Sequence, residues 1–228
     1  FNWLDSQITP PENPETQVEG ELWMVHSGGF YQLEKTMISP SKMPRVLHWF
    51  KWEAYSTWIS GIFLLGIVYY TGSGVYLIDS QIADLSYGMA VCISLGTILA
   101  AWLGYDFLWA SSLGEKGWLP VIFSFVLLFG IIWWFHQWFG SRAAYIHVGA
   151  VMGTLMVGNV WRRIIPSQTK LVDAVKSGKT PEASLGIKAK QRSIHNNYMT
   201  LPVVFIMISN HFPNTFAHQM NWLILKNF

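Results

Sequence analysis

Histidines close to the ends of long apolar stretches are the residues of this sequence best suited to chemistry. Three of them, on three successive stretches, are His136, His147 and His211. Neutral imidazole is the common axial ligand of b-type haem, and ionisable groups near membrane depth are costly and usually functional. Because three imidazoles lie at similar depth, we predict that they are metal ligands that hold b haem. A lone histidine at a helix end can instead hydrogen-bond a carbonyl group, and we favour that role for His218.

The pairing of these ligands stays open. A very short turn joins the stretches that carry His136 and His147, so the two pack directly together and leave little room for a haem between their imidazoles. Each histidine can therefore serve a different partner, including His211 or a histidine outside this sequence. The spacing Gly149-x-x-x-Gly153 after His147 suits a flat macrocycle or, equally, close helix packing. A single haem, with the other histidines purely catalytic, is a further alternative.

A second group of polar residues lies at the opposite ends of the apolar stretches. It comprises three candidate catalytic residues, His26, Lys51 and His195, and three candidate substrate-binding residues, Glu53, Asn196 and Asn197. Asparagine offers both a donor and an acceptor, as an edge-on purine or amide ligand requires, and a helix N-terminus favours an anion. Two plain alternatives remain, because Asn196 can simply cap a helix and Lys51 can snorkel at a membrane interface. Asp106 is either a proton-path residue or a solvated helix end.

The elements that position these residues are predicted to be membrane-spanning helices. Only 12% of the residues are charged, against roughly 25% in a typical soluble domain. A bilayer core about 30 Å thick needs about 20 apolar residues per helix. Tryptophans mark the ends of several qualifying segments, as expected at headgroup level. The five segments are 57–78, 87–109, 118–139, 143–161 and 193–212, and a sixth begins near the end of the sequence.

The basic residues predict the orientation of these helices. With residues 162–192 placed in the cytoplasm, all but two of the 15 Lys and Arg residues fall on that side. The two exceptions are Arg142 and Lys226. The candidate haem ligands then lie near the outer face, and the second polar group lies near the cytoplasmic face. We predict a multi-pass protein of a bacterial inner (cytoplasmic) membrane.

The fold class predicted is an all-α transmembrane bundle with a cytoplasmic cap. Residues 1–56 form the cap and follow a helix outside the sequence, 57–161 hold four helices, 162–192 form a basic loop, and 193–228 hold the fifth helix and the start of the next. The stretch 166–190 is the better candidate for a mobile segment. The only cysteine, Cys92, gives no disulfide and no Cys-x-x-Cys-His motif for a c-type haem.

Three longer stretches carry a resemblance to a known family. They are Trp23-Met-Val-His-Ser-Gly-Gly-Phe-Tyr31, Trp52-Glu-Ala-Tyr-Ser-Thr-Trp-Ile-Ser-Gly61 and Ser193-Ile-His-Asn-Asn-Tyr-Met-Thr-Leu-Pro202, the last continuing into Met207-Ile-Ser-Asn-His211. The sequence resembles the membrane-bound, cytochrome-c-linked urate oxidase (urate hydroxylase) family over essentially its whole length. The resemblance implies oxidation of urate to 5-hydroxyisourate, with electrons passed to a c-type cytochrome whose haem lies outside this sequence.

The function predicted is therefore that of a membrane redox protein. A purine such as urate binds at the cytoplasmic face near Lys51, His195, Asn196 and Asn197, with His26 or His195 as the proton acceptor. Electrons leave through b haem toward the outer face and a c-type cytochrome. The lipid bilayer is the other partner, and no nucleic acid is expected. Two alternatives are a haem-binding or structural subunit of a respiratory complex that does not act on urate, and a transporter, which the absence of charged pairs at mid-membrane disfavours.

Overall fold

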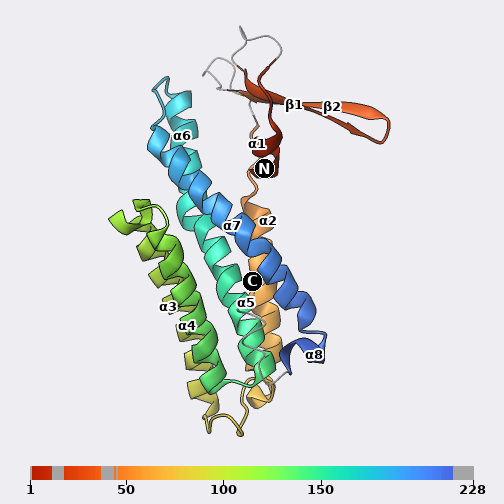
Figure 1. The fold of residues 1–228 in the computed structure, drawn as a ribbon, viewed down its shortest axis with the longest axis vertical. Helices are drawn as coiled ribbons and strands as arrows, with labels where there is room; N and C mark the ends of the chain where they lie inside the picture. Colours follow the sequence, from red (N-terminus) through yellow and green to blue (C-terminus); the bar gives the residue numbers. More distant parts are fainter. Residues whose placement is uncertain (1, 12–17, 37–43, 45, 218–228) are drawn as a thin grey trace. The chain divides into compact units, whose positions relative to one another are not determined.

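The computed structural model describes residues 2–11, 18–36, 44 and 46–217 (Figure 1). The chain forms two compact units. One unit comprises Phe1–Trp49 and Arg163–Ile194, and the other comprises Phe50–Arg162 and His195–Phe228. Among the predicted features, the start of the sixth helix and His218 lie outside the described residues. The second unit carries nearly all of the predicted chemistry, so its helices are described first.

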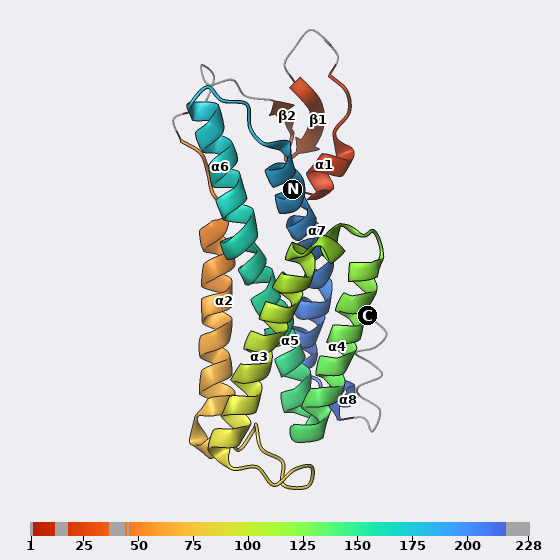
Figure 2. The same ribbon diagram turned by 90° about the vertical axis from the view of Figure 1, so that its left-hand side faces the viewer.

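The second unit is a bundle of helices (Figure 2). Helix α5 contacts α2, α3, α4 and α8, and its inward face carries small residues that allow close approach. A side chain at Gly149 would meet Ile206 of α7, and one at Gly158 would collide with the indole of Trp102. The glycines after His147 therefore serve helix packing at these two positions. The helices are α2 (Lys51–Leu65), α3 (Tyr87–Ala110), α4 (Leu119–Trp138), α5 (Ser141–Asn159), the part of α7 (Ala183–Ser209) that begins at His195, and α8 (Pro213–Phe216).

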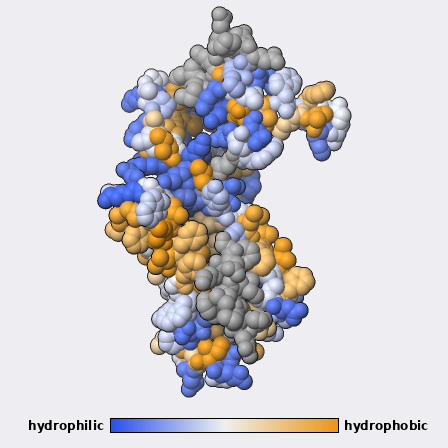
Figure 3. Space-filling view, in the orientation of Figure 1, coloured by the Kyte–Doolittle hydropathy of each residue, from blue (hydrophilic) through white to orange (hydrophobic). Residues whose placement is uncertain are grey.

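Three helices within the described residues are long and apolar enough to cross a membrane. They are α3, α4 and the continuous helical stretch Ser141–Lys176. Broad apolar areas on the bundle are visible in Figure 3. Neither α2 nor α7 qualifies: α2 has 15 residues, about 22 Å at 1.5 Å per residue, and the first half of α7 is polar. The protein is thus mostly helical with three helices suited to crossing a membrane, while five spans remain a prediction.

The first predicted helix differs from the structure at both ends. We expected 57–78, but α2 begins at Lys51 and continues after Leu65 only as one π-helical turn, η2 (Gly66–Tyr70). The chain then becomes extended at Thr71, and Gly72, Ser73 and Gly74 all adopt positive φ angles. Successive left-handed residues end a right-handed helix. The apolar residues that follow this break made the predicted helix too long.

The expected basic loop 162–192 is largely helical. Helix α5 runs through a second π-helical turn, η5 (Val160–Ile164), into α6 (Ile165–Lys176), and α7 begins at Ala183. This segment is rich in Lys, Arg, Gln and Ala, which are good helix formers although their polarity conceals a helix from a hydropathy count. Only residues 177–182 connect α6 to α7.

The first unit contains a β-hairpin, so the predicted helical fold is confirmed for most of the chain but is not all-α. Strands β1 (Val18–His26) and β2 (Gly29–Thr36) are antiparallel, and Ser27 and Gly28, both with positive φ, form the two-residue turn. Positive φ at both turn positions matches the right-handed twist of a hairpin. The short helix α1 (Asn2–Gln7) precedes the hairpin.

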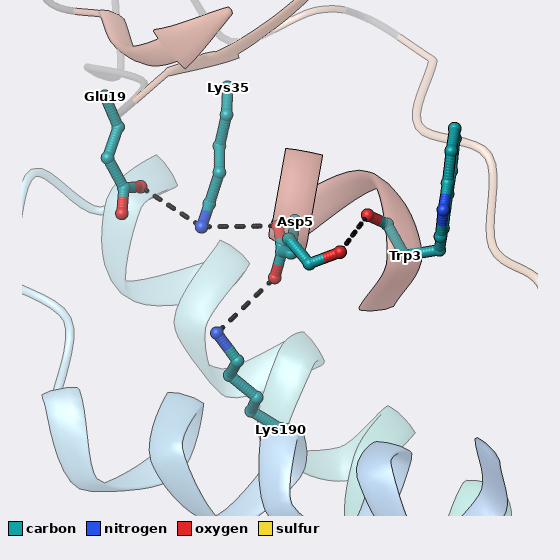
Figure 4. Close-up of polar contacts among 6 residues, drawn as sticks. Trp3, Asp5, Glu19, Lys35 and Lys190 are labelled. Carbon is teal, nitrogen blue, oxygen red and sulfur yellow. Dashed lines mark hydrogen bonds and ion pairs between the residues drawn. The ribbon is translucent and has the colours of Figure 1, made fainter. Parts of the chain in front are cut away.

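Ion pairs connect the hairpin, α1 and the beginning of α7 within this unit (Figure 4). The carboxylate of Asp5 lies 3.4 Å from Lys35 Nζ and 3.5 Å from Lys190 Nζ, and Glu19 lies 3.4 Å from the same Lys35 nitrogen. Burial opposes the charged form of Lys35, but the two carboxylates outweigh it and raise the pKa of this lysine. The residues expected as a cap thus form a compact unit with residues 163–194.

Candidate functional site

Four side chains from three helices form a hydrogen-bonded network in the second unit. Asn159 of α5 donates from Nδ2 to Tyr105 of α3 (3.0 Å) and to Oδ1 of Asn196 of α7 (2.8 Å). Nδ2 of Asn196 donates to the backbone carbonyl of Met156, 3.0 Å away. The Tyr105 hydroxyl lies 2.7 Å from Nδ1 of His195. The chain of contacts therefore runs from a backbone carbonyl through two amides and a phenol to an imidazole, and we call it the Asn159 network.

The burial of the network is graded along its length. Asn159 is 2% exposed and Tyr105 5% exposed, whereas His195 and Asn196 are half-buried. The indole of Trp109, one turn after Tyr105, packs edge-on against His195 with ring centroids 4.1 Å apart. The imidazole is therefore oriented by a hydrogen bond on one side and a ring contact on another, and His195 and Asn196 are the more exposed members of the network.

An ion pair lies next to the network, between α3 and the π-helical turn that follows α5. Asp106 follows Tyr105 on α3, and its carboxylate lies 3.5 Å from Nε of Arg162. The Asp106 side chain is 12% exposed, whereas that of Arg162 is 61% exposed. Asp106 is therefore a paired, nearly buried anion rather than a solvated helix end. The guanidinium opens to solvent and can take a second anionic partner.

A π-helical turn sets the spacing of these groups. Asn159 ends α5, and Arg162 lies in η5, which begins at the next residue. A π-turn inserts one extra residue into a helix, which changes the direction of the side chains after it, and such turns occur frequently at functional sites. The other π-turn, η2, supplies Tyr69 and Tyr70 to the surroundings of His147. Both π-turns therefore coincide with buried polar clusters.

The other predicted inner residues are not in the Asn159 network. Lys51 lies at the start of α2 with Nζ 5.6 Å from the centre of the Trp52 ring, a cation–π arrangement. Glu53 and Asn197 are exposed on α2 and α7. His26 is exposed at the end of β1, in the first unit. Of the six inner candidates, the structure thus brings together His195 and Asn196.

His147 is completely buried in the bundle. Its Nδ1–H donates to the carbonyl of Ala143 (2.7 Å), which leaves Nε2 as an acceptor 3.4 Å from the hydroxyl of Tyr70. That hydroxyl also lies 2.5 Å from Ser94 Oγ. Four aromatic rings have centroids 5.3 to 6.2 Å from the imidazole; they belong to Tyr69, Tyr70, Phe135 and Phe139.

His136 shows the same donor pattern in a different setting. Its Nδ1–H donates to the carbonyl of Ile132 (2.7 Å), and its Nε2 is buried without a hydrogen-bond partner in the described part of the chain. An imidazole with Nδ1–H bonded to a carbonyl and a free Nε2 lone pair is in the state required of an iron ligand. His136 therefore fits an axial ligand, whereas Nε2 of His147 already faces Tyr70 among packed rings. His211 follows α7 and is exposed. Within the described residues, no three His, Cys, Asp or Glu side chains form a metal cluster.

Sequence reasoning missed Tyr105 and Asn159. Tyr105 reads as one more aromatic residue in an apolar helix. Asn159 carried a usable signal, because a lone amide within the apolar stretch 143–161 must find hydrogen-bond partners when it is buried. That requirement pointed to a polar contact between helices, although not to its partners.

The fold and the site define a class: a mostly helical protein with three helices suited to a membrane and an amide–phenol–imidazole network between α3, α5 and α7. The model of the urate oxidase N-terminal family matches residues 1–228, the whole chain. The chain therefore belongs to the urate oxidase N-terminal family. No curated protein and no solved structure matches it.

Proposed function

We propose that the protein is a membrane-bound oxidoreductase that oxidises urate. The observation that carries the proposal is the family match over all 228 residues. Two structural features support it: three helices suited to a bilayer and a partly accessible imidazole held in a buried polar network. Urate is a planar purine that carries amide N–H and carbonyl groups, so it needs both donors and acceptors from its site.

The substrate site in this proposal is centred on His195 and Asn196. The imidazole of His195 contacts the purine. The amide of Asn196, held in place by Asn159, orients the purine. Arg162, a candidate that the structure adds, offers a solvent-accessible guanidinium to an anionic ring. Further contributors to the site are proposed to be Lys51, Glu53, Asn197 and His26. The protein crosses a bacterial inner membrane with five or more helices in this proposal. Its substrate site faces the cytoplasm.

The electron path in this proposal uses b haem and a c-type cytochrome. His136 is the residue best prepared to hold b haem, since its Nε2 is buried and unbonded, and His147 and His211 are the further proposed ligands. When bound, b haem supplies a one-electron carrier, which suits a two-electron donor coupled to a one-electron acceptor. The c-type haem belongs to a domain or partner outside this chain.

A second candidate function rests on the surroundings of His147. His147 is enclosed by four aromatic rings, and both of its ring nitrogens face hydrogen-bond partners. These surroundings are those of a buried histidine whose role is structural. In that case the protein is a haem-binding or structural subunit of a respiratory complex and does not act on urate.

An optical spectrum of the protein purified in detergent, followed by addition of urate, separates these candidates. We expect the reduced protein to show the α band of b haem, and urate to reduce that haem in the oxidised protein. A spectrum without the band would remove the redox proposal and favour a structural subunit. A haem that dithionite reduces but urate does not, with a c-type cytochrome present, would indicate another donor such as a quinol.

A further inference from the structure

The tip of the β-hairpin, Leu22–Leu33, exposes large apolar side chains. Trp23 and Val25 of β1 and Tyr31 of β2 are each more than half exposed, and Phe30 of β2 is 79% exposed. None of these four belongs to the Asn159 network or to the surroundings of His147. Large apolar side chains gathered on a surface mark a site of interaction with a protein, a ligand or a membrane. The hairpin tip is therefore an interaction surface whose occupant its chemistry must identify.

The strand register places apolar side chains on both faces of the hairpin tip. Val25 pairs with Phe30, and Met24 pairs with Tyr31. Side chains alternate along a strand, and the two members of a pair share a face. One face therefore carries Trp23, Val25 and Phe30, and the other carries Met24 and Tyr31. A groove on a partner protein covers one face of a hairpin, whereas a fluid surface that the tip enters covers both faces.

The hairpin tip also carries no charged residue. Asp, Glu, Lys and Arg are absent from Leu22–Leu33 and resume on the two strands with Glu21 and Glu34. Tryptophan and tyrosine are residues that concentrate at the headgroup level of membranes. The sheet has two strands in the described part of the chain, so each strand has an outer edge whose backbone groups need hydrogen bonds from outside the sheet. The hydrated headgroup region supplies such bonds, and the hydrocarbon core does not.

We infer that the hairpin tip binds the surface of the phospholipid bilayer that holds the helices, with its aromatic rings at headgroup level. The inference rests on the proposed function only for the placement of the helices in a membrane, and it does not depend on urate. Because one chain carries both the hairpin and the helices suited to a bilayer, the tip has a high effective concentration at the membrane surface, and a weak contact suffices. His26 lies within the tip, so binding also holds this candidate catalytic residue at the membrane surface.

Depth-dependent fluorescence quenching tests the inference on the protein reconstituted into vesicles of phosphatidylcholine and phosphatidylglycerol. Cys92→Ala removes the only cysteine of the sequence, and a nitrobenzoxadiazole label is then attached at Phe30→Cys or at Tyr31→Cys, one on each face of the tip. The matched control is Glu34→Cys, on the same strand beyond the uncharged tip. All three replaced side chains are exposed. Spin-labelled lipids carry the quencher either near the headgroups or deep in the acyl chains, and flotation shows first that the protein has entered the vesicles.

We expect the labels at Phe30 and Tyr31 to emit at shorter wavelength than the label at Glu34, and to be quenched more by the shallow spin label than by the deep one. Water-like emission without quenching at both tip positions, in protein that floats with the vesicles, would overturn the inference. Emission at shorter wavelength without lipid quenching would also overturn it and would assign the tip to a protein partner. Stronger quenching by the deep spin label would contradict the headgroup placement. Protein that does not enter the vesicles would instead refute the membrane placement in the proposed function, and this inference with it.

Discussion

Replacement of Asn159 by leucine tests the structural importance of the network. Leucine has nearly the same volume, so the change removes two hydrogen bonds with little change in packing. The side chain is 2% exposed, and its loss leaves the Tyr105 oxygen and Oδ1 of Asn196 without their donor. A buried polar group without a partner costs about 1–3 kcal/mol. The Tyr105 hydroxyl keeps its contact with His195, so the change leaves one such group, Oδ1 of Asn196, and removes one further hydrogen bond worth about 1 kcal/mol. With a partly offsetting gain from burying leucine, we predict a destabilisation of about 1–2 kcal/mol.

The assay is denaturant unfolding of purified protein in detergent, followed by tryptophan fluorescence. The matched control is Asn197→Leu, because Asn197 is exposed on the neighbouring helix and surface changes are usually within about 0.5 kcal/mol. We also expect Asn159→Leu to impair urate oxidation more than Asn197→Leu does. Equal stability of the two variants would refute the reasoning, since it would mean that the hydrogen bonds of Asn159 contribute nothing.

Three further predictions concern the haem site, the helix packing and the ion pairs. His136→Ala should remove most b haem from the purified protein, measured as haem per protein, while His211→Ala should remove less; the reverse order would contradict the assignment. Gly149→Ala should be destabilising, because overpacking costs about 1–3 kcal/mol against a gain of about 1 kcal/mol in helix propensity, whereas Gly153→Ala, with open space at its Cβ, should be neutral or stabilising in thermal unfolding. Lys35→Met should cost under about 1 kcal/mol because the pair is partly exposed. The pKa of Lys35 is raised in the folded protein, so this stabilisation is present below the unfolded pKa and disappears as pH rises through the folded value; a difference from wild type that persists above it would contradict the account.

The sequence predicted the helices that are uniformly apolar and bounded by clear signals. The expected 87–109 and 118–139 agree within one or two residues with α3 and α4, and Ser86 caps the first of them by accepting from the backbone of Met89. The prediction was wrong where a helix is polar or where an apolar stretch is not helical. The residues of α6 form a polar helix, and Gly72–Gly74 interrupt an apolar one. A hydropathy pattern reports burial in lipid and does not report backbone conformation.

The candidate site was only partly predictable for a similar reason. His195 and Asn196 were predicted because they were expected to open a helix, whose N-terminus favours an anion. That expectation was wrong, because α7 begins at Ala183 and both residues lie in its middle. Tyr105 and Asn159 lie 54 residues apart, and their contact depends on how α3 packs against α5. The π-turn η5 after Asn159 has no sequence signature that we could read. Contacts between distant segments thus needed the structure.

The ratio of electrons to substrate is the most direct test of the central claim that the protein oxidises urate for a one-electron acceptor. The complete protein is incubated with urate and ferricytochrome c without oxygen, and both urate consumed and cytochrome reduced are measured. The account predicts two cytochromes reduced for each urate lost, with both rates reduced in His195→Leu. Urate that is unchanged while the cytochrome can still be reduced by a quinol would contradict it.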